Sequence, residues 1–291
     1  MPLRTLSPTG FNFCVGVFSG CLLFASSLRA QSTNDPNRPP SAPASQRAAQ
    51  HNPQNASQQS AANGPSGDEK ILFDHLNQSR AQAGLPALVW DAKLADAARK
   101  HCALMVQQRA LSHQFSGEAD LKERLQQAQA EFSVAAENVA LAQSADQIHD
   151  QWMHSAPHRA NILARDVNAV GIAEMPGGNS LYAVEDFAQA VESLSLPQQE
   201  EKIRNLLAAA GMNVVGEDKT ADARKSCQTG KYSGPNAAFA RFDSSDLNRL
   251  PPNLKPLLTA GQYHSAAVGA CDPGRSSDGF THYRVAVLFY P

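Results

Sequence analysis

The sequence lacks an excess of charge of either sign. Its 291 residues include 25 lysines and arginines against 27 aspartates and glutamates, which leaves a formal net charge of −2. A chain this close to neutrality has no overall field that would attract nucleic acid or an anionic membrane surface. The composition therefore gives no support to nucleic-acid binding.

Long apolar runs are absent beyond the N-terminal region. There, a run of apolar and small side chains extends from Phe11 to Leu28, after the single basic Arg4 and before Ala30. These features are typical of a secretory signal peptide cleaved after Ala30. No later stretch approaches the roughly 20 apolar residues that a membrane-spanning helix needs. We therefore expect residues 1–30 to be removed and the mature chain to be secreted or periplasmic, without a transmembrane span.

Two other fates of this N-terminal segment stay open. The segment could remain as an uncleaved anchor in the membrane. It could also be cleaved before Cys21, which would then carry a lipid. The apolar run continues past Cys21, which argues against cleavage at that position.

Cysteine is scarce, with five residues in the chain, and Cys14 and Cys21 belong to the predicted signal peptide. Cys102 lies on the apolar stripe of a predicted helix, so we expect a small, buried and unreactive side chain. Cys227 and Cys271 have polar neighbours, and an exported chain enters an oxidising compartment. We predict a disulfide between Cys227 and Cys271, with Cys102 left free.

Large apolar side chains are almost missing from residues 31–67, which consist mainly of Gln, Ser, Ala, Asn and Pro. Such a composition cannot build a core, so this stretch is predicted to be a disordered linker. From residue 68 onward apolar residues recur with helical spacing, and strand-like segments follow at 167–175 and 181–188. Helices followed by a short antiparallel sheet predict an α+β domain over residues 68–190.

The remainder of the chain, residues 191–291, predicts a small α+β module of unknown function. A helix is expected over 197–210, with strands near 239–242, 263–270 and 283–290. No internal repeat is evident in the sequence.

Two hydrolase signatures are also absent. No H-E-x-x-H helix occurs, and no G-x-S-x-G turn surrounds Ser112. The sequence does contain His113, Glu137 and His158 in three separate polar segments. Two imidazoles and a carboxylate can form a three-ligand Zn²⁺ site with a fourth position for water, and the same trio suits proton transfer. Their spacing alone does not show that they meet.

These segments, in this order, resemble the CAP superfamily, which includes the cysteine-rich secretory, antigen 5 and pathogenesis-related (SCP-like) proteins. The third segment is similar to the W-x-x-S-P-x-H-R-x-N-I-L pattern of the bacterial branch. The resemblance implies an α–β–α sandwich with a central cleft. The residues that carry it are Leu76–Arg80, Gly84–Leu88 with Trp90, Leu111–His113, Ala136–Ala140 and Trp152–Leu163.

The resemblance also implies which residues face the cleft. In the family, two histidines and acidic residues face it and can bind a divalent metal, here expected to be Zn²⁺. The matching histidines are His113 and His158, and Glu137 matches the acid of a G-E-N motif in which Ala136 replaces Gly. The second acid of fuller members is replaced by Ser155. The missing acid favours binding over catalysis.

Other polar residues near these motifs have simpler expected roles. Glu118 could line the cleft, although an exposed acid in the first turn of a helix is the simpler interpretation. Asn138 is expected to make backbone hydrogen bonds. Arg159 and Asn161 are expected to hold the turn that follows the motif histidine, and Trp152 is expected in the core.

Three functions of different classes stay open. The first is a secreted module of the cell envelope or extracellular space that binds a metal, lipid or peptide in the cleft without turnover. The second is a metal-dependent hydrolase of peptidase type that uses the same cleft. The third is an envelope interaction protein, in which the linker tethers the domain and the C-terminal module holds a partner. We favour the first from the sequence.

Overall fold

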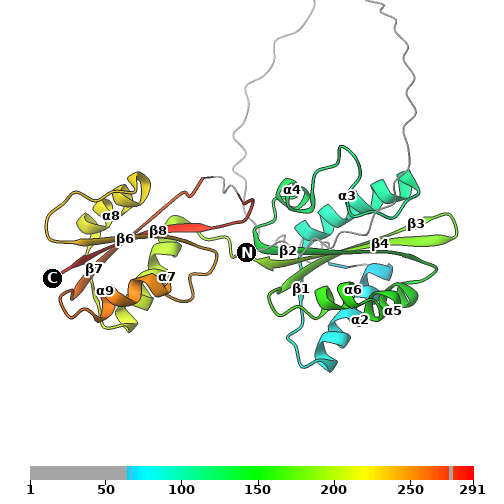
Figure 1. Cartoon of the computed structure of the whole chain (residues 1–291), viewed down its shortest axis with the longest axis horizontal. Coiled ribbons are helices and arrows are strands. Elements are labelled where there is room, and N and C mark those ends of the chain that lie inside the picture. Colours follow the sequence, from blue (N-terminus) through cyan, green and yellow to red (C-terminus); the bar gives the residue numbers. More distant parts are fainter. Residues whose placement is uncertain (1–63, 66, 275–277) are drawn as a thin grey trace, which may run out of the picture. The chain divides into compact units, whose positions relative to one another are not determined.

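The computed structural model describes residues 64–65, 67–274 and 278–291. The predicted signal peptide and nearly all of the predicted linker lie outside the described residues, so neither prediction is tested. Within the described part of the chain, no helix is both long and apolar enough to cross a membrane. Two four-stranded sheets follow one another along the chain, each with helices on both faces (Figure 1).

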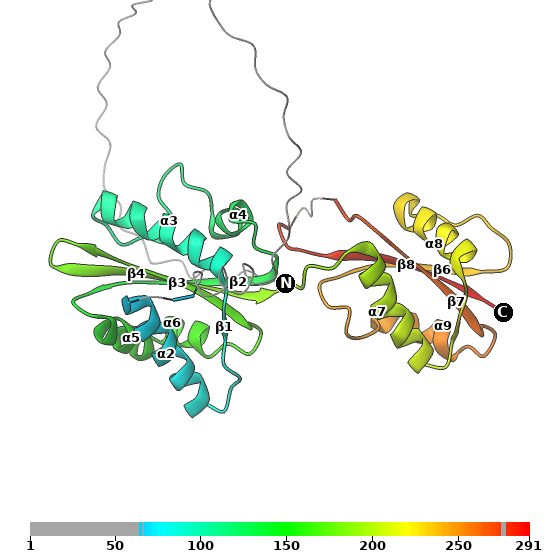
Figure 2. The same cartoon turned by 180° about the vertical axis from the view of Figure 1, so that it is seen from behind.

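The first sandwich is built around a mixed sheet with the strand order β1-β3-β4-β2. Strand β1 runs parallel to β3, and the other neighbours are antiparallel. Helices α3 and α4 cover one face, while α2, α5 and α6 cover the other (Figures 1 and 2). Its elements are α2 (Gly67–Gln82), β1 (Val89–Trp90), α3 (Ala92–Gln108), α4 (Leu121–Gln127), β2 (Phe132–Ala142), α5 (Ala145–His154), α6 (Ala156–Ile162), β3 (Ala169–Gly177) and β4 (Ser180–Ala190). The α+β class and the layered architecture expected from the sequence are confirmed.

Local sequence explains how α3 is placed on this sheet. Asp91 caps the helix, because its side chain accepts hydrogen bonds from the amides of Lys93 and Leu94. The helix then packs against β3 at Gly171, where an added Cβ would lie 2.0 Å from the backbone nitrogen of Ala95. Only glycine permits this close approach of helix and strand.

The sheet separates two apolar layers. Trp152 is the largest fully buried side chain on the α2, α5 and α6 side, and its indole Nε1 donates to the carbonyl of Val139. On the α3 side, Cys102 is buried with Met105 and Val184. Trp152 and Cys102 therefore have the buried positions expected from their helical periodicity.

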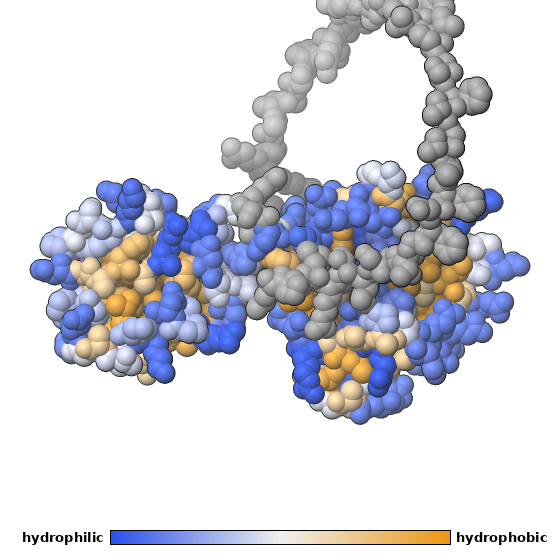
Figure 3. All heavy atoms as spheres, viewed as in Figure 1, coloured by the Kyte–Doolittle hydropathy of each residue, from blue (hydrophilic) through white to orange (hydrophobic). Residues whose placement is uncertain are grey.

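The C-terminal module contains a second sheet with the order β5-β7-β8-β6. Helix α8 packs against one face of this sheet, and α7 and α9 lie on the other (Figures 1 and 2). Apolar side chains gather toward the middle of the module and hydrophilic ones along its rim on the face drawn in Figure 3. Its elements are α7 (Leu196–Ala209), β5 (Asn213–Val214), α8 (Glu217–Thr229), β6 (Ala238–Ser244), the 3-10 turn η1 (Pro252–Leu254), α9 (Lys255–Thr259), β7 (Ser265–Cys271) and β8 (Tyr283–Tyr290).

The structure contains a disulfide between Cys227 of α8 and Cys271 of β7, whose Cα atoms are 5.8 Å apart. Cys102 is buried and free. The bond joins a helix to the sheet beneath it, across a separation of 44 residues. A closure of this length stabilises the fold by about 3–4 kcal/mol in the loop-entropy description.

Sequence periodicity missed two elements of the fold, β2 and α8. Strand β2 carries Glu137 and Asn138, and its many Ala, Ser and polar residues have low β propensity. Helix α8 is rich in charge, and its buried stripe consists of small side chains such as Ala223 and Cys227. Both elements are stabilised by packing against a neighbouring strand, and the periodicity of the local sequence does not show such long-range contacts.

Candidate functional site

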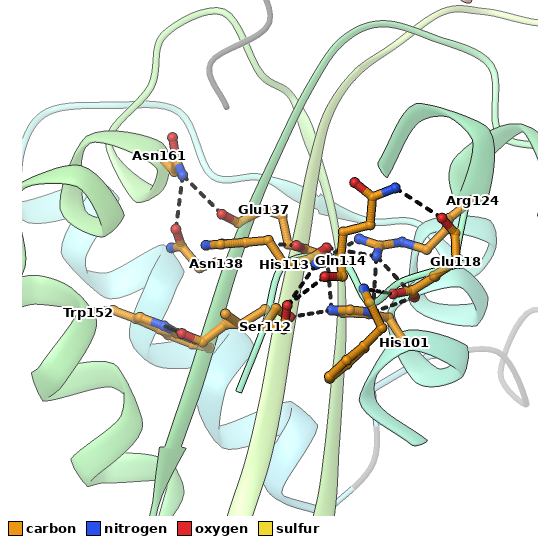
Figure 4. A network of polar contacts seen from close by, with 12 residues as sticks. His101, Ser112, His113, Gln114, Glu118, Arg124, Glu137, Asn138, Trp152 and Asn161 are labelled. Atoms are coloured by element: carbon orange, nitrogen blue, oxygen red, sulfur yellow. Dashed lines mark hydrogen bonds and ion pairs between the residues drawn. The ribbon is translucent and has the colours of Figure 1, made fainter. Parts of the chain in front are cut away.

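Glu137 lies in the middle of β2, and its side chain is only 4 % exposed. A buried carboxylate requires partners that satisfy its charge. Its Oε1 accepts a hydrogen bond from Nδ1 of His113 at 2.8 Å, and Nη2 of Arg124 bonds to its Oε2. Figure 4 shows these three side chains converging from a strand, a loop and a helix.

Arg124 connects the acid to the loop that carries the first motif histidine. The guanidinium comes from α4 and is 6 % exposed. Besides Glu137, its Nη1 donates to the carbonyl of His113 at 3.0 Å and to Oε1 of Glu118 at 3.2 Å. The buried guanidinium of Arg124 thus fixes both the side chain of Glu137 and the backbone at His113.

A second layer of contacts lies behind this arginine. His101 of α3 is fully buried, its Nε2 donates to the carbonyl of Ser112 at 2.8 Å, and its Nδ1 lies 2.6 Å from Oε1 of Glu118. Oε2 of Glu118 accepts the amide hydrogen of Phe115 at 2.9 Å. The loop between α3 and α4 has no regular structure, so these contacts fix its path and the place of His113.

Glu118 was expected to be a simple exposed helix acid, and that interpretation is wrong. Burial disfavours its charged form, but hydrogen bonds from the Phe115 amide and His101, with the charges of His101 and Arg124, outweigh burial. The pKa of Glu118 therefore lies below its ordinary value. Glu118 belongs to the buried polar network around His101 and Arg124.

His113 is held by its buried partner but remains open to solvent. Its side chain is 43 % exposed, in contrast to Glu137 beneath it. Because the carboxylate can only accept, Nδ1 of the ring donates to Glu137. Nε2 is then the nitrogen that lacks a proton in the neutral ring and can accept a proton or bind a ligand.

His158 lies on α6 and is half-buried. Burial lowers the pKa of its imidazole, and the charge of nearby His113 lowers it further. Asn138 donates to the carbonyl of His158 at 3.2 Å, and Asn161 donates to Oδ1 of Asn138 at 2.9 Å and to the carbonyl of Glu137 at 3.3 Å. These side chains join the strand segment of Glu137 to the helix segment of His158.

Two buried acids on β4 lie beside this network and were missed in the sequence. Asp186 pairs with Glu137 across the strands, and Glu185 pairs with Asn138. Burial raises the pKa of Glu185 to about 8. Burial, and after it the charge of Glu137, raises the pKa of Asp186 well above its ordinary value. Two adjacent acids inside an apolar strand are a detectable signal, because such residues are costly to bury.

The expected three-ligand metal set does not match this geometry. Glu137 already binds His113 and Arg124 through its two oxygens, and Ser155 stands at the place of a second acid. Among the described residues, no group of three or more His, Cys, Asp and Glu side chains is arranged to hold a metal. Glu137 is therefore the residue that orients the ring of His113.

The remaining motif residues divide between core and surface. Asn161 is buried and makes the polar contacts expected of it, whereas Arg159 is exposed. Asn138 bonds to the His158 backbone and also to Oε2 of Glu185 at 3.1 Å, so its role is wider than the backbone bonding that was expected.

The layered fold and its polar network belong to a class of protein that a family comparison identifies. Residues 73–187 match CAP, the cysteine-rich secretory protein family. This part of the chain, which holds every residue of the polar network described above, is a CAP domain.

The chain is similar to the uncharacterized membrane protein YlbC of Bacillus subtilis, with 29 % identity over 120 residues. The aligned part covers 41 % of this chain and 34 % of the relative, so the chain spans about a third of the length of that relative.

Among solved structures, the chain is similar to an extracellular protein with an SCP domain from Bacillus anthracis, with 27 % identity. That alignment covers 49 % of this chain and 45 % of the other, with a TM-score of 0.38. A cysteine-rich secretory protein from Staphylococcus aureus is 22 % identical over 41 % of this chain and 37 % of the other, with a TM-score of 0.34. An outer surface protein from Borrelia burgdorferi is 20 % identical over 42 % of this chain and 92 % of the other, with a TM-score of 0.40.

Proposed function

We propose that this chain is an exported CAP-domain protein that binds a ligand through His113 and His158 without turning it over. The observation that supports this most strongly is the contrast between the exposed ring of His113 and the buried pair of Glu137 and Arg124 that holds it. A ring whose orientation is fixed before binding loses little conformational entropy when a ligand arrives. The site is therefore organised for recognition.

A divalent transition metal such as Zn²⁺ is the ligand class that two imidazoles suit best. Nε2 of His113 and a ring nitrogen of His158 would hold the ion, and Glu137 would keep the His113 ring in place. A bound ion would supply a Lewis acid with positions open to a group from a lipid, a peptide or another envelope molecule. Two protein ligands give weaker binding than the three or four of established zinc sites.

Export is part of the same proposal. A disulfide such as the one between Cys227 and Cys271 persists in an oxidising compartment outside the cytoplasm, so this bond supports export. The apolar segment that ends before Ala30 supplies the expected route to that compartment.

Isothermal titration of the EDTA-treated protein with ZnCl₂ tests the binding proposal. Binding should be lost in the double variant His113→Ala/His158→Ala. It should persist in His154→Ala, a matched control in which an exposed histidine of α5 is removed. Since only the neutral imidazole binds metal, affinity should fall when the pH is lowered far enough to protonate the rings. Unchanged zinc binding by a folded double variant would contradict the proposal.

Hydrolysis is the second candidate, because one contact favours it. A carboxylate that orients an exposed imidazole, as Glu137 does for His113 at 2.8 Å, is the arrangement of a general base. Against it, Arg124 neutralises Glu137, and the second acid is replaced by Ser155. Assays of peptide and ester cleavage, with and without EDTA, distinguish hydrolysis from binding without turnover. Turnover that His113→Ala abolishes would replace binding by catalysis as the proposed function.

A further inference from the structure

The C-terminal sheet repeats the design of the CAP sheet. The orders β1-β3-β4-β2 and β5-β7-β8-β6 are the same when the strands are numbered within each sheet. In both sheets the short first strand runs parallel to its neighbour, and the other pairs are antiparallel. The order along the chain is also shared: a helix, a short strand, a helix, a long strand, short helices and two final strands.

We infer that residues 196–290 are a second, shortened copy of the CAP-type fold that has lost the polar site. Helix α7 corresponds to α2, and α8 corresponds to α3. Strands β5 to β8 correspond to β1 to β4 in order. This inference does not depend on what the cleft of the first copy binds.

The register of the strands supports the correspondence in two independent ways. The parallel pairs set Val89 beside Ala169 in the first copy and Asn213 beside Ser265 in the second, which aligns Ala169 with Ser265. The second alignment comes from the cysteines of the two central helices.

Cys102 donates to the carbonyl of Tyr182 at 3.2 Å, and Tyr182 pairs with Met175. Cys227 lies in the same way against the carbonyl of Arg284 at 3.4 Å, and Arg284 pairs with Cys271. Met175 therefore aligns with Cys271. Both alignments place β3 on β7 identically, because Met175 is as far beyond Ala169 as Cys271 is beyond Ser265.

The helices show the same correspondence in sequence. The segment A-D-A-A-R-K-H-C ends at Cys102, and A-D-A-R-K-S-C ends at Cys227, with one residue fewer. Each helix also approaches its sheet at a glycine, Gly171 under α3 and Gly269 under α8. These two glycines are not aligned positions, because the strand register sets Gly171 against Ala267, two residues before Gly269. The first helix of each copy is followed by a glycine with positive φ, Gly84 or Gly211.

The polar network has no counterpart in the second copy. Tyr182 aligns with Arg284, so Asp186 aligns with Leu288, and their cross-strand partners Glu137 and Phe239 align with each other. Helix α4, which brings Arg124 in the first copy, is also missing between α8 and β6. An apolar pair thus replaces the two facing acids, and the chain carries one cleft site in its described residues. The disulfide takes the place of the Cys102 and Met175 contact.

The alignment predicts a disulfide that the natural chain does not have. In the full chain carrying Met175→Cys, oxidised glutathione should accept two electrons and two protons from Cys102 and the new thiol at position 175. Peptide mapping without reductant should then recover the two segments linked. Glu174→Cys is the matched control, because adjacent strand residues point to opposite faces of a sheet. Failure of the first variant to link, or equal linking in the control, overturns the inference.

The reciprocal change keeps the test decisive if Met175→Cys does not fold. Cys271→Met should give the second copy the Cys and Met arrangement of the first. We expect native circular dichroism and a Cys227 thiol that reacts with Ellman's reagent only after unfolding, as Cys102 should. A folded protein whose Cys227 thiol reacts at once, or a chain that does not fold, contradicts the correspondence of the two positions.

Discussion

Arg124 is the side chain on which the geometry of the cleft depends most. It satisfies the buried Glu137, bonds the carbonyl behind His113 and touches Glu118. Removal of one partner from a buried ion pair leaves the other charge without compensation, at a cost well above that of a surface pair. A single residue outside the family motifs therefore positions the motif histidine.

Arg124→Met should lower the free energy of unfolding by about 3–5 kcal/mol, because it leaves Glu137 buried and unpaired. Urea denaturation followed by circular dichroism measures this loss. Lys70→Met is the control, since Lys70 and Asp74 are 61 % and 60 % exposed in their ion pair and its loss should cost at most about 1 kcal/mol. Equal losses of unfolding free energy in the two variants would mean that the ion pair of Arg124 with Glu137 stabilises the fold no more than a surface pair does.

His149 of α5 lies on the other face of the sheet from α3 and α4, and we expect it to make the stability of the domain depend on pH. Burial, and then the charge of His75, lowers the pKa of His149 to about 4, and its Nε2 bonds to Ser79 at 2.9 Å. The unfolded chain, with an ordinary pKa of 6.5, binds this proton more readily than the folded chain. Stability from this group is therefore complete above about pH 6.5 and is lost as the pH falls toward 4.

The loss amounts to at most about 3 kcal/mol. Urea midpoints of the wild type and His149→Gln at pH 7, 5 and 4 should differ in slope, with the variant less sensitive to acid. Parallel curves for the two proteins would show that His149 does not titrate abnormally.

At the scale of elements, periodicity predicted the helices and the hairpin, but not the strand that carries the acid. Apolar residues follow helical spacing along each helix, as Leu94 does in α3 and Trp152 does in α5. Gly178 and Asn179 make the turn between β3 and β4. Strand β2 has no such pattern, because it gains its stability from pairing along its length with β4. The partner His101 was missed because its long-range contacts leave no local signal, whereas the adjacent acids Glu185 and Asp186 in an apolar strand did leave one.

Gly171→Ala tests the packing of α3 on β3. The new methyl group meets backbone atoms of Leu94 and Ala95, which cannot move without shifting the helix. Thermal and urea unfolding should show a loss of about 1–3 kcal/mol. Gly171→Ala should also perturb His101, which α3 carries into the network.

For the whole molecule, the family resemblance predicted the sandwich and the meeting of His113 with Glu137. It could not predict that Glu137 is already occupied by Arg124, because Arg124 comes from a segment outside the matching motifs. The second copy of the fold was missed in the sequence, because its strands kept their order and register while the side chains of the site became apolar. The pairing of strands reveals it, and the short match between the helix segments that end at Cys102 and Cys227 agrees with that pairing.

Processing of the chain is a prediction at this scale as well. The exported protein should begin close to Gln31, as the apolar run and Ala30 indicate. N-terminal sequencing of protein recovered outside the cytoplasm gives the answer. A chain that still begins at Met1 would contradict cleavage, and a lipidated Cys21 would identify a lipoprotein.

The central claim is that His113 and His158 form one ligand-binding site whose first ring is held by Glu137. Its most direct test is a spectrum of the histidine ring nitrogens by NMR, recorded while Zn²⁺ is added to the full chain. The account predicts that the ring signals of His113 and His158 shift together and saturate at one ion per chain, while those of His154 stay in place. Zinc that leaves both rings unchanged, or that shifts only one of them, would contradict it.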